Sequence, residues 1–174
     1  MRKPRELSIG AEYHVTARIN RGEFALETSE NKKLFLLIVK RAKKKYFFSI
    51  HNFSVMDNHV HLHIKPGRNE NLSRIMQWIL GVFAKAFNKK YNLKGHVWYD
   101  RFHSTVIKSY RQLIATFKYI CNNPVKAEIV EKPEDYKFGG LWYIHHRRFD
   151  FIEPPDPLIR TVLSENFKQL LITE

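Results

Sequence analysis

Hydrophobic and polar residues alternate most clearly over residues 59–65, where three histidines alternate with branched aliphatic residues. Successive side chains of a strand point to opposite faces. The pattern therefore predicts a strand with His59, His61 and His63 on one face and an aliphatic surface, which needs a core, on the other. Three more strands are predicted over residues 11–19, 46–56 and 97–107. Asp57-Asn58 is predicted as a two-residue hairpin turn, because both residues tolerate positive φ.

Apolar residues at helical spacing predict four helices. The clearest follows Asn71, a natural N-cap, because seven apolar positions between residues 72 and 87 fall on one stripe. The other three are predicted over residues 27–45, 111–122 and 158–172. Pro124 is expected to end the third helix in chain order, because the residue before a proline disfavours the α region. Residues 141–144 are predicted as a short strand.

The order strand, helix, strand, strand, helix, strand, helix predicts the fold class α+β. We expect a ferredoxin-like antiparallel sheet of about four to five strands with helices packed on one face. The other face would then be free to carry a site. A catalytic domain is expected over residues 1–140, followed by a C-terminal extension over residues 141–174. Within this extension, the proline-rich stretch at 154–157 is predicted as a stiff linker that leads to the terminal helix.

Charge and cysteine content narrow the function. The 174 residues include 30 Lys+Arg against 17 Asp+Glu, a formal net charge of +13. This excess predicts attraction to a polyanion, either nucleic acid or an anionic membrane surface. The lysine-rich helix at 27–45 is read as a solvated face or as a phosphate-contacting edge. A single cysteine, Cys121, excludes an internal disulfide, and no apolar run or signal-peptide core is seen. We expect a soluble protein of the cytoplasm.

Three imidazoles on one strand face contribute little to packing, and imidazole is the commonest side-chain ligand for a divalent metal. The pair His59–His61 has the spacing for such a site, and so does the pair His61–His63. A solvent-facing strand without metal is the alternative, because a His-x-His sequence also arises by chance.

Three segments resemble the motifs of one family. Residues 56–62, MDNHVHL, are similar to the M-x-N-H-V-H-L signature of single-tyrosine HUH transposases. Residues 118–127, KYICNNPVKA, resemble their Y-I-x-x-N-P-V-K-A-G helix end. Residues 95–102, GHVWYDRF, are similar to a G-x-x-W-x-x-R-F/Y stretch of the REP-associated tyrosine transposases, which with their insertion-sequence relatives form the most similar branch. The resemblance covers roughly residues 11–140.

The resemblance implies a metal-dependent endonuclease and transposase. Its site would use His59, His61 and Asn123 as metal ligands, Tyr119 as nucleophile and Mg²⁺ or Mn²⁺ as cofactor. The substrate implied is single-stranded DNA, often a hairpin, cut through a 5′-phosphotyrosine intermediate. Four residues separate Tyr119 from Asn123, so one helix turn can present both to the sheet. The plain alternatives are a boundary tyrosine and a helix-capping asparagine.

Other features leave alternatives open. The residue that follows the N-H-V-H-L motif is usually apolar in the family, and here it is His63. Three roles are open for this residue: a further metal ligand, a phosphate contact or an exposed side chain without a role. Candidate DNA contacts are His63, Lys85, Lys89, Arg101 and His103. Trp98, Tyr99 and Trp142 can stack on unpaired bases, although core packing is expected for at least two of them. The first alternative to the enzyme is a domesticated module that binds nucleic acid without cutting, although every expected catalytic position is filled. A second alternative is an unrelated metal-binding protein. The oligomeric state is open, and a homodimer is possible.

Overall fold

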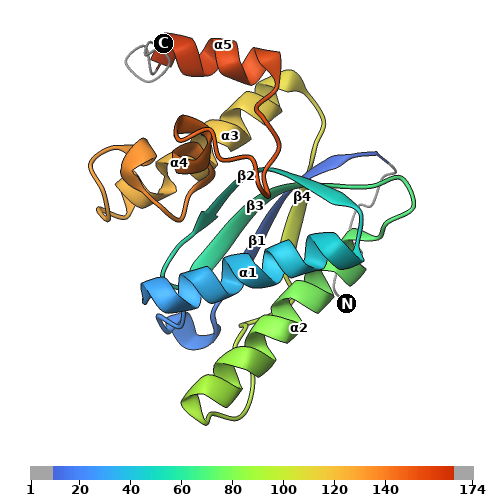
Figure 1. Ribbon diagram of the computed structural model, residues 1–174, viewed down its shortest axis with the longest axis vertical. Coiled ribbons are helices and arrows are strands. Elements are labelled where there is room, and N and C mark those ends of the chain that lie inside the picture. The colour runs from blue at the N-terminus through green and yellow to red at the C-terminus, as the bar shows by residue number, and fades with distance from the viewer. Residues whose placement is uncertain (1–9, 167–174) are drawn as a thin grey trace.

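The structure of the chain is a computed structural model that describes residues 10–166. It is built around one antiparallel sheet (Figure 1). Its four strands lie in the order β2-β3-β1-β4. Their bounds are β1 Glu12–Arg18, β2 Phe48–Val55, β3 His59–Pro66 and β4 His103–Ile107. All three neighbouring pairs are antiparallel. The α+β class and the antiparallel sheet predicted from the sequence are confirmed.

The two faces of the sheet differ in chemistry, as the alternation in β3 predicts. In the register of β1 with β3, Val15 lies opposite Leu62 and Thr16 lies opposite His61. Val15 and Leu62 are fully buried in the main hydrophobic core. The same alternation places the histidines of β3 beside the polar positions of β1 on the second face, which we call the imidazole face.

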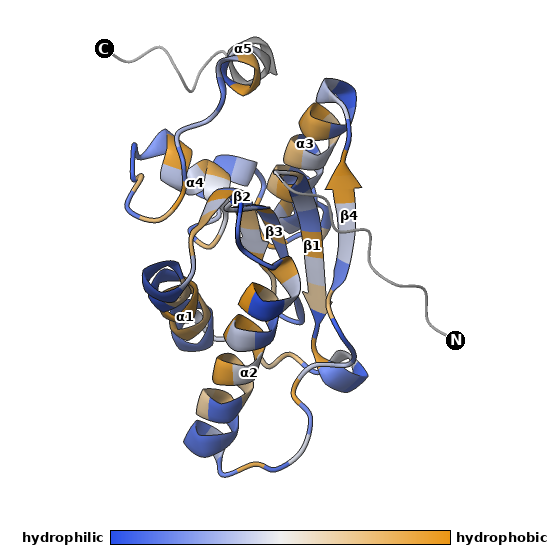
Figure 2. Cartoon of the chain, turned by 90° about the vertical axis from the view of Figure 1, so that its right-hand side faces the viewer, coloured by the Kyte–Doolittle hydropathy of each residue, from blue (hydrophilic) through white to orange (hydrophobic). Residues whose placement is uncertain are grey.

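Helices α1 (Ser29–Lys45) and α2 (Leu72–Tyr91) cover the aliphatic face. Thr28 caps α1 by accepting from Asn31 N, and Asn71 caps α2 by accepting from Ser73 N at 2.8 Å. Both helices are banded with hydrophobic and hydrophilic residues in Figure 2, as amphipathic helices are. The predicted cap at Asn71 is confirmed. None of the helices in residues 10–166 is both long and apolar enough to cross a bilayer.

The hairpin between β2 and β3 is as short as predicted, because Met56 N donates to His59 O at 2.9 Å. Neither Asp57 nor Asn58 has positive φ, so that part of the expectation is wrong. An ion pair with a residue of α1 stabilises the turn instead. Lys32 of α1, only 5% exposed, places Nζ 2.5 Å from Asp57 Oδ1. Helix α1 thus stabilises the turn that leads into β3, the strand that carries the histidines.

Helix α3 (Tyr110–Lys126) packs on the imidazole face, over β2 and β3, so this face is partly covered and not free as expected. The side chain of Asn52 in β2 donates to Phe117 O at 3.2 Å. Pro124 lies inside α3 and does not end it. It stands in the last turn, where its missing N–H removes the helical hydrogen bond to the carbonyl four residues earlier, and its side chain is buried.

Of two further predictions of strands, one is wrong and the other is wrong in part. Residues 141–144 lie in a short helix, α4 (Gly140–His145), that packs against β2. A Cβ at Gly140 would lie 2.3 Å from Asn52 Oδ1, so only glycine permits this approach. The segment 97–107 is strand only from His103, after a single bridge between Ile19 and Trp98.

Two short 3-10 turns, at Asn20–Gly22 and Pro133–Asp135, complete the connections between the longer elements.

The last described segment packs against the core and ends in α5, which spans Pro157–Asn166. The predicted terminal helix is therefore present at its start, and residues 167–172 lie outside the described residues. Phe151 and Ile152 are 2% and 1% exposed and belong to the core cluster. Buried residues between 141 and 159 thus share one core with the sheet.

Candidate active site

Two histidines from β3 lie side by side on the imidazole face. The ring centroids of His59 and His61 are 4.9 Å apart and the rings are nearly perpendicular. His59 Nδ1 is 2.7 Å from Asn58 Oδ1, in the hairpin turn. Arg18 of β1 lies opposite His59 in the strand register. The pair therefore sits at the turn end of β3, beside a cation.

The ring of His61 is held from behind by β1. Its Nδ1 is 3.0 Å from His14 Nε2 and 3.1 Å from Thr16 Oγ1. Its Nε2 is buried and has no hydrogen-bond partner among residues 10–166. If Nδ1 carries the proton and donates to Thr16 or His14, the lone pair is left on Nε2, which is the arrangement of a metal-binding imidazole with an oriented second nitrogen.

Both imidazoles are held in their neutral form. Burial lowers the pKa of His61 to about 3, and the neighbouring His59, His14 and Arg18 lower it further by charge repulsion. Burial, then Arg18, also lowers the pKa of His59. The nearby side chain of Asn123 acts in the opposite sense and raises both pKa values. Neutral imidazole is the form that binds a metal ion.

Helix α3 brings a phenol and an amide to these rings. The ring of Tyr119 meets the ring of His61 edge-on at a centroid distance of 5.4 Å, and that of His14 at 5.7 Å. Tyr119 is 43% exposed, so part of this residue is open to solvent. Asn123 Nδ2 donates to Tyr119 O at 2.8 Å, which directs the amide oxygen away from that bond. Lys126 Nζ lies 5.4 Å from the Tyr119 ring centroid.

These residues fit a divalent cation. The orphaned Nε2 of His61, the neutral His59 and the amide oxygen of Asn123 offer two nitrogens and one oxygen. Within residues 10–166 no three His, Cys, Asp or Glu side chains are arranged to hold a metal. A divalent cation held here would therefore need an amide oxygen as its third protein ligand, with water suited to the remaining positions.

A family model described as "Transposase IS200 like" matches residues 8–123, two thirds of the chain. The chain belongs to the IS200-like transposase family. The matched range includes both histidines and ends at Asn123. No curated protein matches the chain significantly.

Two solved structures share the fold of this transposase. One is a REP-associated tyrosine transposase bound to a REP hairpin, with 21% identity, a TM-score of 0.72, and coverage of 84% of this chain and 86% of that one. The other is a putative transposase from Deinococcus radiodurans R1, with 16% identity, a TM-score of 0.50, and coverage of 70% and 97%. At such identities the likeness supports the fold alone.

In the structure of this transposase, the predicted site residues fall into two groups according to where they lie. His59, His61, Tyr119 and Asn123 come together as described above. His63 does not join them: it is 1% exposed and its Nε2 lies 2.8 Å from Glu12 Oε2, so the expectation of an exposed residue is wrong. Lys85 and Lys89 are exposed on α2, which covers the opposite face of the sheet. Arg101 and His103 are exposed near the start of β4.

The supporting residues of β1 were not predicted from the sequence. His14, Thr16 and Arg18 lie in none of the motifs found in the sequence. A signal was present, because polar residues occupy every second position from Glu12 to Arg18. Such alternation indicates a polar strand face. Only the register of β1 with β3 reveals that this face continues that of the histidines.

Proposed function

We propose that this transposase nicks and rejoins single-stranded or hairpin DNA through a covalent 5′-phosphotyrosine on Tyr119. One observation carries the proposal: the exposed Tyr119 ring lies 5.4 Å from the His61 ring, whose Nε2 has no partner among the described residues. A nucleophile and a cation site are thus offered by one chain, side by side.

The reaction is a transesterification. The oxygen of Tyr119 forms a bond to the scissile phosphorus, and the bond from phosphorus to the 3′ oxygen of the preceding nucleotide breaks. The phenol proton is lost to solvent and the departing 3′ oxygen gains a proton, so a free 3′-hydroxyl remains. Attack by a 3′-hydroxyl on the phosphotyrosine reverses the step and joins strands. One difficult step is divided into two easier ones.

Each residue has a separate task in this scheme. His59, His61 and Asn123 would hold Mg²⁺ or Mn²⁺, which when bound polarises the phosphate and stabilises the charge that builds on it. Thr16 and His14 fix the ring of His61. Arg18 adds positive charge beside the site, where the scissile phosphate is expected.

Hairpin DNA is the proposed substrate for two reasons. The net charge of +13 favours a polyanion. A protein with the same fold is described as bound to a REP hairpin. Electrostatic binding of this kind predicts an affinity for hairpin DNA that falls steeply with salt.

The covalent intermediate is tested with labelled single-stranded hairpin DNA and Mn²⁺, read on a denaturing gel. Wild type is expected to give a covalent band. Tyr119→Phe is expected to give none and to bind the hairpin as wild type does. Tyr110→Phe is the matched control, because Tyr110 is 71% exposed at the start of the same helix. A band in Tyr119→Phe would overturn the proposal.

A hairpin bound without any covalent band in wild type would favour the non-cutting module. Metal dependence is tested by His61→Ala and by a chelator, each of which should abolish cleavage. Cleavage that persists in chelator would remove the cation from the mechanism.

We further propose that the tyrosine acts in its own chain, whether or not the protein is a homodimer. An equimolar mixture of Tyr119→Phe and His61→Ala chains should then remain inactive. Recovered cleavage would mean that Tyr119 of one chain serves the histidines of another.

A further inference from the structure

A cavity of about 630 Å³ lies between α2 and the segment 95–102 that leads to β4. Figure 2 shows this connection leaving the far end of α2 and returning beside the sheet. The volume is in the range of small-molecule sites. None of the residues assigned above to catalysis or metal binding lines it.

Aromatic side chains form one wall of the cavity. Trp98 is fixed, because its Nε1 donates to Leu80 O at 2.9 Å and its ring packs against Phe83 at a centroid distance of 5.4 Å. Tyr99 is 72% exposed at the same wall. A rigid indole beside an open phenol provides flat surface for stacking, which is how proteins bind unpaired bases.

The opposite wall contains a glycine that the fold does not require. Gly81 lies in the middle of α2, where glycine costs about 1 kcal/mol relative to alanine. A Cβ at this position would meet no described atom within 4 Å. No packing or backbone reason for glycine is therefore found among the described residues. Its missing side chain has one evident effect, which is to leave the cavity open.

Polar groups stand at the rim. Gln77, His96 and Arg101 line the cavity together with Asp100. An amide can pair with the edge of a base, and a guanidinium can bind a base edge or a phosphate. The lining thus combines a stacking surface with groups able to read or hold a nucleotide.

The cavity is joined to the candidate active site through β1. Tyr99 N donates to Arg18 O at 2.9 Å, and Trp98 forms a bridge with Ile19. Arg18 lies opposite His59 in the strand register. The backbone of Tyr99, at the cavity wall, is therefore bonded to the residue of β1 that lies opposite His59.

We propose that this cavity binds an unpaired base of the DNA strand that is cut, stacked on Trp98 and Tyr99. The inference rests on the proposed function for its substrate class, because it names the base site of that same strand. It assigns to Gly81 the task of making room and to Gln77 and Arg101 the contacts with the nucleotide.

The first test needs no change in the cavity. Hairpins with single-stranded flanks are made abasic at one flanking position at a time and their binding is measured by fluorescence anisotropy at fixed salt. The protein is the full chain with Tyr119→Phe, so that strand cleavage does not enter. Loss of one base is expected to weaken binding about 5- to 100-fold at one position. Equal binding at every position would overturn the proposal and leave the phosphotyrosine chemistry untouched.

The second test fills the cavity. Gly81→Phe should weaken binding of the flanked hairpin by a similar factor, while a blunt hairpin without flank binds as before. Gly81→Ala should have a smaller effect. Tyr99→Ala should act in the same direction as Gly81→Phe, and Tyr110→Ala, at equal exposure, should not. Unchanged binding of the flanked hairpin by both Gly81→Phe and Tyr99→Ala, with folding verified by circular dichroism, would refute a base site here.

Discussion

Thr16 and His61 face each other across the ladder of β1 and β3, with 3.1 Å between Thr16 Oγ1 and His61 Nδ1. This contact leaves Nε2 as the free nitrogen of the ring. The orientation of a ligand is commonly set by such an outer contact, so the effect of removing it can be stated in advance.

Thr16→Val keeps the shape of the side chain and removes the hydroxyl. We expect the Mn²⁺ concentration that gives half-maximal cleavage to rise about 10- to 100-fold, measured by titration with labelled hairpin DNA. Thr161→Val, at an exposed position of α5, is the control. An unchanged Mn²⁺ requirement in Thr16→Val would show that this contact does not orient the ligand.

Acid should weaken the contact between Glu12 and His63. The hydrogen bond from His63 lowers the pKa of Glu12 from 4.5 to about 2, against the opposing effect of burial. A depressed carboxyl pKa stabilises the fold above pH 4.5, and this contribution is lost as the pH falls from 4.5 towards 2. Glu12→Gln should therefore be less stable than wild type at pH 7, on the order of 1 kcal/mol after solvent screening.

The difference in free energy of unfolding should shrink to near zero at pH 2, as measured by urea denaturation at each pH. Glu23→Gln, at an exposed position, serves for comparison and should leave stability unchanged at both pH values. A deficit in Glu12→Gln that persists undiminished at pH 2 would contradict the assignment.

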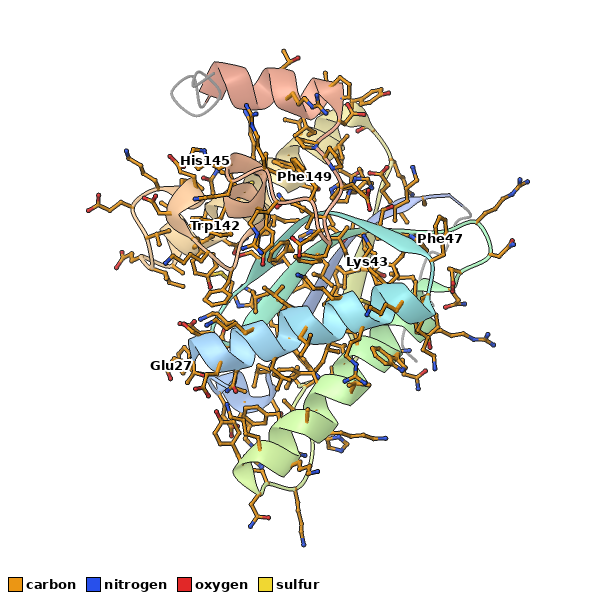
Figure 3. All side chains as sticks on the ribbon, viewed as in Figure 1. Glu27, Lys43, Phe47, Trp142, His145 and Phe149 are labelled. Carbon is orange, nitrogen blue, oxygen red and sulfur yellow. The ribbon has the colours of Figure 1, made fainter. Side chains whose placement is uncertain are left out.

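The segment after α4 should be essential to stability. Phe151 is 2% exposed, and its ring lies 5.1 Å from that of Phe53 in β2 and 5.3 Å from that of Tyr143 in α4. Phe151→Ala is expected to cost about 3–5 kcal/mol in chemical denaturation. Phe149→Ala, which removes the exposed aromatic labelled in Figure 3, should stay within about 0.5 kcal/mol. Equal effects would mean that this segment is not part of the core.

The single thiol should be inert while the protein is folded. Burial raises the pKa of Cys121 to about 12, and its Sγ accepts a hydrogen bond from Asn52 Nδ2 at 3.3 Å. Only the thiolate reacts, so modification at pH 8 should be about 1000-fold slower in the folded than in the urea-unfolded chain. Comparable rates, followed with a chromogenic disulfide, would show that α3 opens readily from the sheet.

Much of the sheet and of the candidate site follows from local patterns. The alternation around His61 and the apolar stripe of α2 are strong because each extends over a whole element. The expectations failed where tertiary contacts override local preference. Residues 141–144 are apolar and bulky, yet they form a helix that packs against β2, with Gly140 lying against Asn52. Pro124 lies inside α3 although a proline removes one helical hydrogen bond, and its side chain is buried there.

Predictions about the surroundings of single residues failed for a related reason. The burial of His63 depends on a carboxylate 51 residues earlier in the chain. The support of His61 by Thr16 depends on the register between two strands. Neither the partner nor the register is encoded near the histidine itself, so no local pattern could have revealed them.

The pairing of the lysines of α1 narrows the set of cations that can contact DNA. Lys32, Lys40 and Lys43 form ion pairs with Asp57, Asp150 and Glu153. Three cations of this helix are therefore engaged within the protein and contribute little to the neutralisation of phosphates, which is what releases counterions from DNA. The slope of log affinity against log salt should accordingly be set by cations outside these pairs.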